Sequence, residues 1–366
     1  MNQPAGLVTN IQTNRKRWFI ASIVFLVIAV AGLFWAKWNP YFHKAFTAAT
    51  THAIGSSTIS GNDAAAPDPS WGAAWHFSLG YFKSIWQAFI VGILLASLVQ
   101  VLVPRDWIQR VLGKTSYGST VLAGVSALPG MMCTCCSAPL VVGLRRQQSS
   151  VAAAVAFWFG NTALNPAVLI FMFFVLGWQF TLLRLVVGVI LVFGLSYVVG
   201  KMVRHKEDAV EVVAQTTAAS NGKDTKDDPK ESLFIRWLKS LSTMSMAIIP
   251  AYIISVFVLG AFRAWLFPTL GGTAWSDSLL AVLVFAVVGT LFVIPTAGEI
   301  PIVQTFMEFG LGVGPAAALI ITLPVISLPS ALMVRKALTW RTLSFLGIGV
   351  AMLGVIAGLV GMAFMS

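Results

Sequence analysis

Long apolar stretches separated by short polar ones follow each other along almost the whole chain. Seven of them come near the roughly 20 residues that an α-helix needs to cross about 30 Å of hydrocarbon. In a bilayer, helices satisfy their own backbone hydrogen bonds, so this pattern predicts an all-α polytopic membrane protein. The predicted spans lie at about 18–36, 79–103, 150–177, 180–200, 243–262, 313–334 and 343–364.

Two further apolar stretches are interrupted near their middle. Pro129 and Pro139 bracket the cysteines of "ALPGMMCTCCSAPL", and Pro295 and Pro301 bracket the small residues around Gly298. Prolines lack a backbone N–H and interrupt helices. Exposed backbone groups at membrane depth are tolerated only inside protein or facing a water-filled cavity. The sequence therefore predicts two re-entrant hairpins shaped by these prolines and Gly298.

Two polar segments divide the chain. The small polar residues of 39–75 predict an external loop, and the charged residues of 201–235 predict a flexible cytoplasmic linker. The first span follows "NRKRW" without a cleavage site, which favours a retained signal-anchor. The predicted organisation is a signal-anchor span with an external loop (1–78), a first transmembrane repeat (79–200), the linker (201–238) and a second transmembrane repeat (239–366).

The two halves share a pattern of prolines. Pro139 and Pro166 lie 27 residues apart, and Pro301 and Pro329 lie 28 apart. Each half is predicted to hold one span, one interrupted segment and two more spans, so the second half starts from the opposite side of the membrane. This parity predicts an inverted-topology repeat, as in many secondary transporters.

Composition and charge agree with a membrane protein. Hydrophobic residues make up 57% of the chain and charged residues 10%, against about 25% charged residues in soluble proteins. With the N-terminus cytoplasmic, 19 of the 24 lysines and arginines fall on the cytoplasmic side, which is the positive-inside pattern. The net charge of +11 then calls for no nucleic acid. The remaining basic residues are placed outside: Lys37, Lys44, Lys83, Arg184 and Arg263.

All three cysteines of the chain, Cys133, Cys135 and Cys136, fall within four positions of the first interruption. Three soft thiols could bind a trivalent metalloid or Cu(I), so they form a tentative metalloid-binding set. The alternative is that small buried cysteines let helices approach closely. Their place between two prolines favours the binding role.

The second interruption carries Glu299, a carboxylate predicted at membrane depth. Such an acid is costly and is by default a functional residue, and its desolvation suits a proton-coupling group. Alignment of Pro139 with Pro301 pairs Glu299 with Ser137. Besides the cysteines and Glu299, the candidate substrate-binding residues are Asn161 and Asn165 of "FGNTALNP", Ser137, Thr296 and Gln304.

Metal binding by histidines, nucleotide binding and catalysis receive less support from the sequence. His43, His52 and His76 lie in or beside the predicted outer loop and could capture a metal, but scattered solvated histidines are the better interpretation. No nucleotide-binding or hydrolytic motif is present, and neither a catalytic group nor a cofactor is predicted. The expected partners are a small-molecule or metalloid substrate and the lipid bilayer, and a homo-oligomer is compatible with the sequence.

The segment "CTCCSAPLVVGLRRQQSSVAAAVAFWFGNTALNPAVL" resembles the predicted permease family that contains the organoarsenical efflux permeases. Cys133, Cys135, Cys136, Pro139 and the pair Asn165–Pro166 match that family's pattern, and the resemblance extends over about 79–364. It implies a multi-pass permease of the bacterial inner membrane that exports trivalent organic arsenicals. The tip differs from the commoner Cys-Ser-Cys-Gly sequence of the family.

The sequence thus predicts a secondary permease for a soft, thiol-reactive substrate, with efflux of a trivalent arsenical coupled to protons through Glu299. A first alternative is a permease for a sulfur-containing anion such as thiosulfate, held by Arg145 and Arg146. A second alternative is a membrane protein that carries reducing equivalents through its thiols.

Overall fold

The computed structural model describes residues 22–60, 63, 67–203, 233–267 and 277–365, and in these residues the protein is helical without strands. Seven described helices are long and apolar enough to cross a membrane. They confirm the predicted all-α polytopic architecture. Their bounds are Ser22–Thr51, Trp71–Leu102, Val151–Val175, Trp178–Met202, Phe234–Leu266, Val313–Val334 and Trp340–Phe364.

The first helix continues well beyond the predicted end of the first span. A π-helical turn, η1 (Phe34–Trp38), leads directly into α2 (Asn39–Thr51), which the sequence analysis had placed in the external loop. The wider turn lies just ahead of Pro40, whose missing N–H would otherwise interrupt the α-helical hydrogen bonding. The helix therefore continues past Pro40.

Helices α3 (Trp71–Leu102) and α12 (Leu233–Leu266) run alongside each other on one side of the molecule. The Tyr81 and Tyr252 hydroxyl groups, one from each helix, lie 2.9 Å apart in their interface. Pro250 is accommodated inside α12. These two helices open the first and the second half of the described fold.

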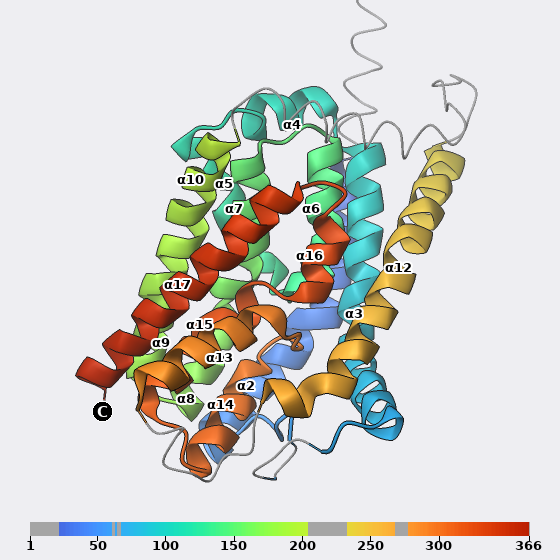
Figure 1. Cartoon of the computed structure of the whole chain (residues 1–366). Helices are drawn as coiled ribbons and strands as arrows, with labels where there is room; N and C mark the ends of the chain where they lie inside the picture. Colours follow the sequence, from blue (N-terminus) through green and yellow to red (C-terminus); the bar gives the residue numbers. More distant parts are fainter. Residues whose placement is uncertain (1–21, 61–62, 64–66, 204–232, 268–276, 366) are drawn as a thin grey trace, which may run out of the picture.

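The first half continues with short helices that meet at mid-height. Helix α5 (Tyr117–Ala127) descends in Figure 1, the turn η2 (Leu128–Gly130) and residues 131–133 follow, and α6 (Thr134–Arg146) returns to the same end. The next apolar segment is broken into α7 (Val151–Ala163) and α8 (Pro166–Val175). The remaining elements are α4 (Arg105–Leu112), α9 (Trp178–Val189), η3 (Ile190–Leu195) and α10 (Ser196–Met202).

The second half continues with two helices near the other end of the molecule. Helices α13 (Leu279–Leu291) and α14 (Glu299–Glu308) lie in the lower half of both views, joined by residues 292–298 at mid-height. A second broken segment, α15 (Val313–Val325) and α16 (Leu328–Val334), follows, and α17 (Trp340–Phe364) ends the described chain. Four helix breaks therefore gather near the centre of the molecule.

Two of the predicted helix-breaking prolines lie within helices. Pro139 is inside α6, so the break at the cysteines lies upstream of it, at 128–133. Pro301 lies in the first turn of α14, where a backbone N–H has no helical partner to lose. Most of the predicted linker, residues 204–232, and the N-terminal residues 1–21 lie outside the described residues.

Helix α3 packs directly on the cysteine helix α6. A side chain at Gly92 would collide with the Cys136 carbonyl, so only glycine permits the two backbones to approach this closely. Cys135 and Cys136 are fully buried behind this contact. The glycine on α3 thus helps to fix the position of the cysteines.

Candidate functional site

The two central loops have the same local geometry. Met131 and Ala297 both adopt left-handed backbone conformations, with φ of 48° and 67°, and each lies two residues after a proline, Pro129 or Pro295. A non-glycine residue in this region costs free energy and is retained where the surrounding fold enforces it. We call these loops, 128–133 and 292–298, the first tip and the second tip.

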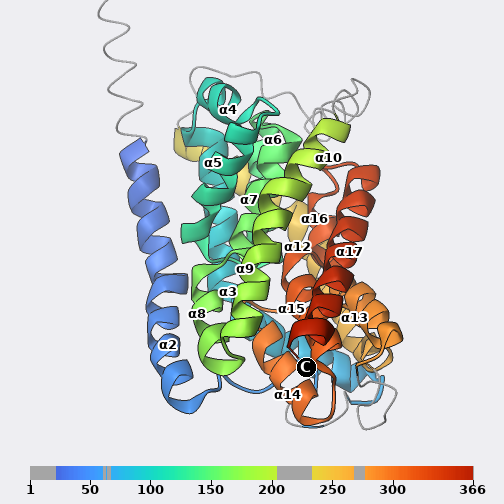
Figure 2. The ribbon, with the colours of Figure 1, turned by 90° about the vertical axis from the view of Figure 1, so that its left-hand side faces the viewer.

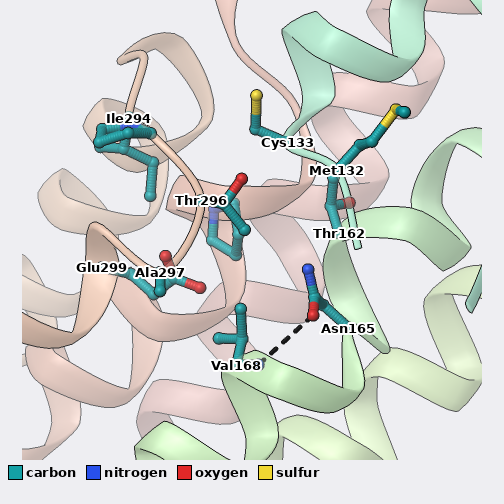
Figure 3. A pocket seen from close by; sticks show the side chains of 11 residues that line it. Met132, Cys133, Thr162, Asn165, Val168, Ile294, Thr296, Ala297 and Glu299 are labelled. Atoms are coloured by element: carbon teal, nitrogen blue, oxygen red, sulfur yellow. Dashed lines mark hydrogen bonds between the residues drawn. The ribbon is translucent and has the colours of Figure 1, made fainter. Parts of the chain in front are cut away.

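A small cavity separates the two tips. It has a volume of about 10 Å³, which is about the minimum needed to hold one water molecule. Its polar lining comes from both halves and from the break between α7 and α8 (Figure 3). We call it the tip cavity. Its lining residues are Met132, Cys133, Thr162, Asn165, Val168, Ile294, Pro295, Thr296, Ala297, Glu299 and Pro324.

Asn165 has both a structural role and an unused donor. Its Oδ1 accepts hydrogen bonds from the backbone N–H groups of Ala167 and Val168, at 3.1 and 3.4 Å, and so caps α8. Its Nδ2 is buried and has no hydrogen-bond partner, and Figure 3 shows the amide at the edge of the tip cavity. A buried donor without a partner is costly, which makes this group available to a ligand.

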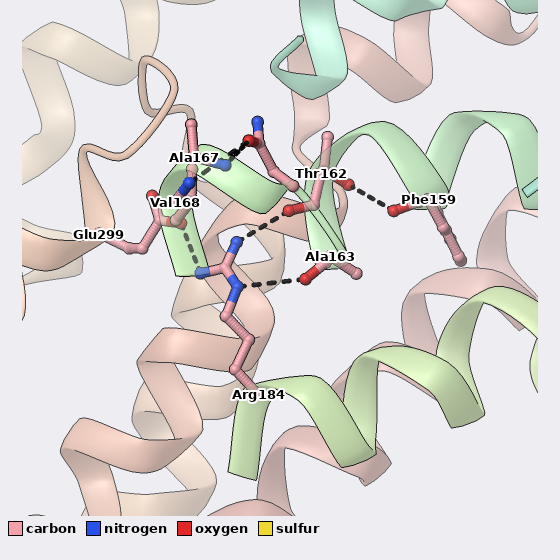
Figure 4. A network of polar contacts seen from close by, with 8 residues as sticks. Phe159, Thr162, Ala163, Ala167, Val168, Arg184 and Glu299 are labelled. Carbon is pink, nitrogen blue, oxygen red and sulfur yellow. Dashed lines mark hydrogen bonds and ion pairs between the residues drawn. The ribbon is translucent and has the colours of Figure 1, made fainter. Parts of the chain in front are cut away.

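Glu299 forms a buried ion pair with Arg184. The Arg184 Nη1 donates to Glu299 Oε1 at 2.6 Å, and both side chains are 1% exposed. Arg184 also donates to the carbonyls of Ala163 and Thr162, at 3.2 and 2.8 Å, which are the last carbonyls of α7 (Figure 4). These carbonyls would otherwise lack partners. One guanidinium therefore caps the broken helix of the first half and holds the acid of the second half.

The second oxygen of Glu299 is left without a partner. Oε2 is buried, accepts no hydrogen bond from any described residue and belongs to a side chain that lines the tip cavity. Together with Asn165 Nδ2, it gives this cavity one unused acceptor and one unused donor.

The cysteines divide into a pair and a single residue. The Sγ atoms of Cys133 and Cys136 lie 2.9 Å apart, whereas the Cys135 Sγ lies 3.8 Å from the Ser327 Oγ at the start of α16. No group of three or more His, Cys, Asp or Glu side chains among the described residues is arranged to hold a metal ion. The tentative three-thiol ligand set is therefore not assembled in this structure, because successive residues of a helix point in different directions.

Cys133 and Cys136 have Cys-x-x-Cys spacing at the start of α6, where Cys133 is the N-cap residue. The stretch "CTCC" already contains this spacing, which was missed in the sequence-based interpretation of the cysteines. Such pairs at helix N-termini are typical of reactive thiols.

Three other predicted substrate-binding residues lie away from the tip cavity. The Ser137 hydroxyl donates to the Cys133 carbonyl within its own helix. Asn161 donates from Nδ2 to the Phe157 carbonyl, and its Oδ1 is buried without a partner. Gln304 donates to the His52 carbonyl at 3.4 Å. Of the predicted residues, the tip cavity brings together Cys133, Asn165, Thr296 and Glu299, along with Pro295.

A larger cavity shares the second tip as one of its walls. It has a volume of about 290 Å³ and contains two lysines of the first helix, so we call it the lysine cavity. Lys37 is 4% exposed, and its Nζ donates to Tyr41 Oη at 2.8 Å and to Thr296 Oγ1 at 2.9 Å. The lining residues are Ala36, Lys37, Pro40, Tyr41, Lys44, Ile54, Ser56, Thr58, Ser84, Gln87, Ala88, Pro295, Thr296, Ala297, Gly298 and Pro301.

The first helix also contacts the first tip. The Trp38 Nε1 donates to the Pro129 carbonyl at 2.8 Å. Lys37, Arg184 and Arg263, which the sequence analysis placed on the external side, are all buried, at 4%, 1% and 7% exposure. Charge counting cannot anticipate this burial, because one partner of each of two cations, Thr296 for Lys37 and Glu299 for Arg184, lies far away in the chain.

Comparison with known proteins gives the family. The family model ArsP_1, described as a predicted permease, matches residues 70–363. The chain belongs to this permease family. It is 47% identical over 348 residues to the UPF0718 protein YraQ of Escherichia coli K12, covering 95% of this chain and 96% of the relative. It is also 26% identical over 333 residues to the UPF0718 protein MJ0584 of Methanocaldococcus jannaschii, covering 75% of this chain and 91% of that relative. No solved structure matches the chain significantly.

Family membership and the seven apolar helices of the described residues identify a multi-pass membrane permease, which supports a transporter role. A membrane permease acts on a small-molecule substrate within the bilayer. The first helix, with Lys37 and Trp38, precedes the residues matched by the family model, yet it contacts both tips.

Proposed function

We propose that this permease moves a small soft substrate through the tip cavity, and that the substrate is a trivalent organic arsenical or a related metalloid that leaves the cytoplasm. The observation that carries this proposal is the Cys133–Cys136 pair, 2.9 Å between Sγ atoms, with Cys133 in the wall of a cavity that both tips line. Sulfur ligands favour soft acceptors, and Met132 adds a thioether to the same wall.

Two thiols are sufficient for this chemistry. Each As–S bond would form as a thiol gives up its proton and arsenic gives up a hydroxide, which together make water. The reverse exchange would release the substrate. Cys135 takes no part in this mechanism, because its thiol lies near Ser327.

The proposed architecture is an inverted-topology repeat with two re-entrant hairpins. The shared order of helices supports it, as do the left-handed Met131 and Ala297 at corresponding points of the two tips. Hairpins that approach mid-height from opposite ends (Figure 2) would give a permease two gates around one site, as alternating access requires. The bacterial inner membrane, with the N-terminus cytoplasmic, is the proposed location.

Proton coupling is proposed to act at Glu299. Its Oε2 lines the tip cavity without a partner while Oε1 is held by Arg184. A proton that binds Oε2 would neutralise the carboxylate and weaken its hold on Arg184, which also caps α7. Protonation would thereby couple the second tip to the break in the first half.

A sulfur-containing anion is the alternative substrate. The observation in its favour is the pair of lysines in the cavity behind the second tip, rather than Arg145 and Arg146. Arg145 donates instead to the carbonyls of Ser149 and Ala337, and Arg146 donates to Gln100.

A thiol redox function is the second alternative, and the Cys-x-x-Cys spacing favours it. In that case Cys133 and Cys136 would lose two electrons and two protons to a membrane oxidant and form a disulfide. Alkylation of the free thiols before and after turnover would detect this change.

Everted membrane vesicles test the proposal. We expect energised uptake of a trivalent phenylarsenical that falls at least tenfold in Cys133→Ser and Cys136→Ser but persists in the matched variant Cys135→Ser. Uptake of thiosulfate without uptake of the arsenical would favour a sulfur-containing anion as the substrate. Equal arsenical transport by all three variants would remove the thiols from the mechanism.

A further inference from the structure

The lysine cavity has a positively charged lining in the described part of the chain. Lys37 and Lys44 both line it, and its lining includes no aspartate or glutamate. The ion pair of Arg184 with Glu299 involves neither of these lysines. Tyr41 and Thr296, the partners of the Lys37 ammonium, are both neutral.

This arrangement is unfavourable without an anion. An ammonium taken out of water loses more solvation than neutral hydrogen-bond partners restore. Lys37, Tyr41 and Lys44 follow each other at helical spacing on one face of the first helix, so two like charges point toward the same space. An anion between them would relieve both costs.

Donors for such an anion come from several sides. The Lys37 ammonium has three N–H bonds, of which two are used. Gln87 of α3 lines the cavity with an amide, and the Thr58 Oγ1 is buried there without a hydrogen-bond partner. With Lys44, the donors come from the first helix, the following loop and α3. The volume of about 290 Å³ is far above the roughly 10–15 Å³ that one water needs.

We propose that the lysine cavity binds a small tetrahedral oxyanion, such as sulfate, phosphate or thiosulfate, through Lys37, Lys44, Gln87 and Thr58. Donors on several sides suit an anion whose oxygens point in several directions. Because the segment 295–297 forms a wall of both cavities, the bound anion would lie directly behind the second tip. Its lining includes no cysteine, and it does not require the proposed arsenical transport.

Binding to the purified full-length protein in a neutral detergent tests the site. Sodium sulfate, phosphate and thiosulfate would each be titrated against sodium chloride of equal ionic strength, with calorimetry and thermal unfolding as readouts. A ligand of the folded state raises the unfolding temperature as its concentration exceeds Kd. We expect saturable binding of at least one of these oxyanions and none of chloride.

Three lysine variants make the test specific. Lys37→Gln and Lys44→Gln are each expected to raise Kd by roughly tenfold or more, since a charge-assisted hydrogen bond is lost. Lys83→Gln is the matched control, because Lys83 is an exposed lysine of α3 next to Ser84 but outside the cavity lining. Lys44 is only partly buried, so Lys44→Gln remains informative if Lys37→Gln fails to fold.

The outcomes separate this proposal from others. Oxyanion binding that weakens in the two cavity variants, and is unchanged in Lys83→Gln, supports the site. Absence of saturable binding overturns it, as does an equal loss in all three lysine variants. Binding of phosphatidylglycerol in mixed micelles that displaces all three oxyanions would assign the lysines to a lipid phosphate and also overturn the proposal.

Discussion

The guanidinium of Arg184 and the carboxylate of Glu299 lie 2.6 Å apart although 115 residues separate them in the chain. This pair joins the break between α7 and α8 to the start of α14, and so links the two halves of the permease at the level of the tips. Its burial makes it sensitive to substitution in a predictable way.

Removal of either partner should destabilise the protein strongly. Arg184→Met and Glu299→Leu each leave a buried charge unpaired, which costs about 3–5 kcal/mol. The double variant should recover part of that loss. Unfolding in mixed micelles would measure the free energy of unfolding of all three variants. Glu308→Gln is the control and should have little effect, because Glu308 is an exposed acid at the far end of α14. Additive losses in the double variant would show that the two residues do not act as a pair.

Two substitutions of Asn165 should distinguish its effect on stability from its effect on transport. Asn165→Ala removes the N-cap of α8, at a cost of about 1 kcal/mol. Asn165→Ser restores a capping oxygen but lacks the Nδ2 donor that faces the tip cavity. We therefore expect Asn165→Ser to unfold near the wild-type temperature yet to transport poorly. Full transport by a stable Asn165→Ser variant would contradict a role for Nδ2 in substrate binding.

Gly92 should be far more sensitive to a methyl group than a glycine on the same helix. Gly92→Ala pushes against the Cys136 backbone, and such overpacking costs about 1–3 kcal/mol. A Cβ added at Gly80 of α3 would meet nothing within 4 Å, so Gly80→Ala should be neutral or slightly stabilising through helix propensity. Thermal unfolding of the two variants compares them directly. Similar unfolding temperatures would mean that α3 and α6 are not in close contact.

Much of this fold is predictable because the length of an apolar run is a local property of the sequence. The predicted spans at 150–177 and 313–334 coincide with Val151–Val175 and Val313–Val334 almost to the residue. The break in the structure, at 128–133, includes the predicted Pro129 but ends before Cys135, and Pro139 lies inside α6 rather than at the break. From the sequence alone, a proline at the sixth residue of a short helix looks the same as a proline that ends a helix.

The charged partners were not predictable in this way. Lys37 meets Thr296 across 259 residues, and no local pattern marks either residue as a partner of the other. The pairing of Glu299 with Ser137, taken from the alignment of prolines, stays a prediction. Counting from the left-handed residues Met131 and Ala297 would pair Glu299 with Cys133 instead. These backbone conformations do not appear in the sequence pattern.

The central claim is that the two tips meet around one cavity, and a disulfide cross-link tests it most directly. In a Cys135→Ser/Cys136→Ser background, Thr296→Cys places a second thiol opposite Cys133 in the lining of the tip cavity. Gln304→Cys in the same background is the control, because Gln304 contacts His52 instead. A protease site inserted in the predicted linker 201–238 would report whether the halves stay joined after oxidation.

We predict that oxidised Thr296→Cys protein keeps its two halves together after cleavage until a reductant is added, and that the Gln304→Cys control separates at once. If Thr296→Cys separates as readily as the control, the two tips do not enclose a common site and the proposed pathway is wrong.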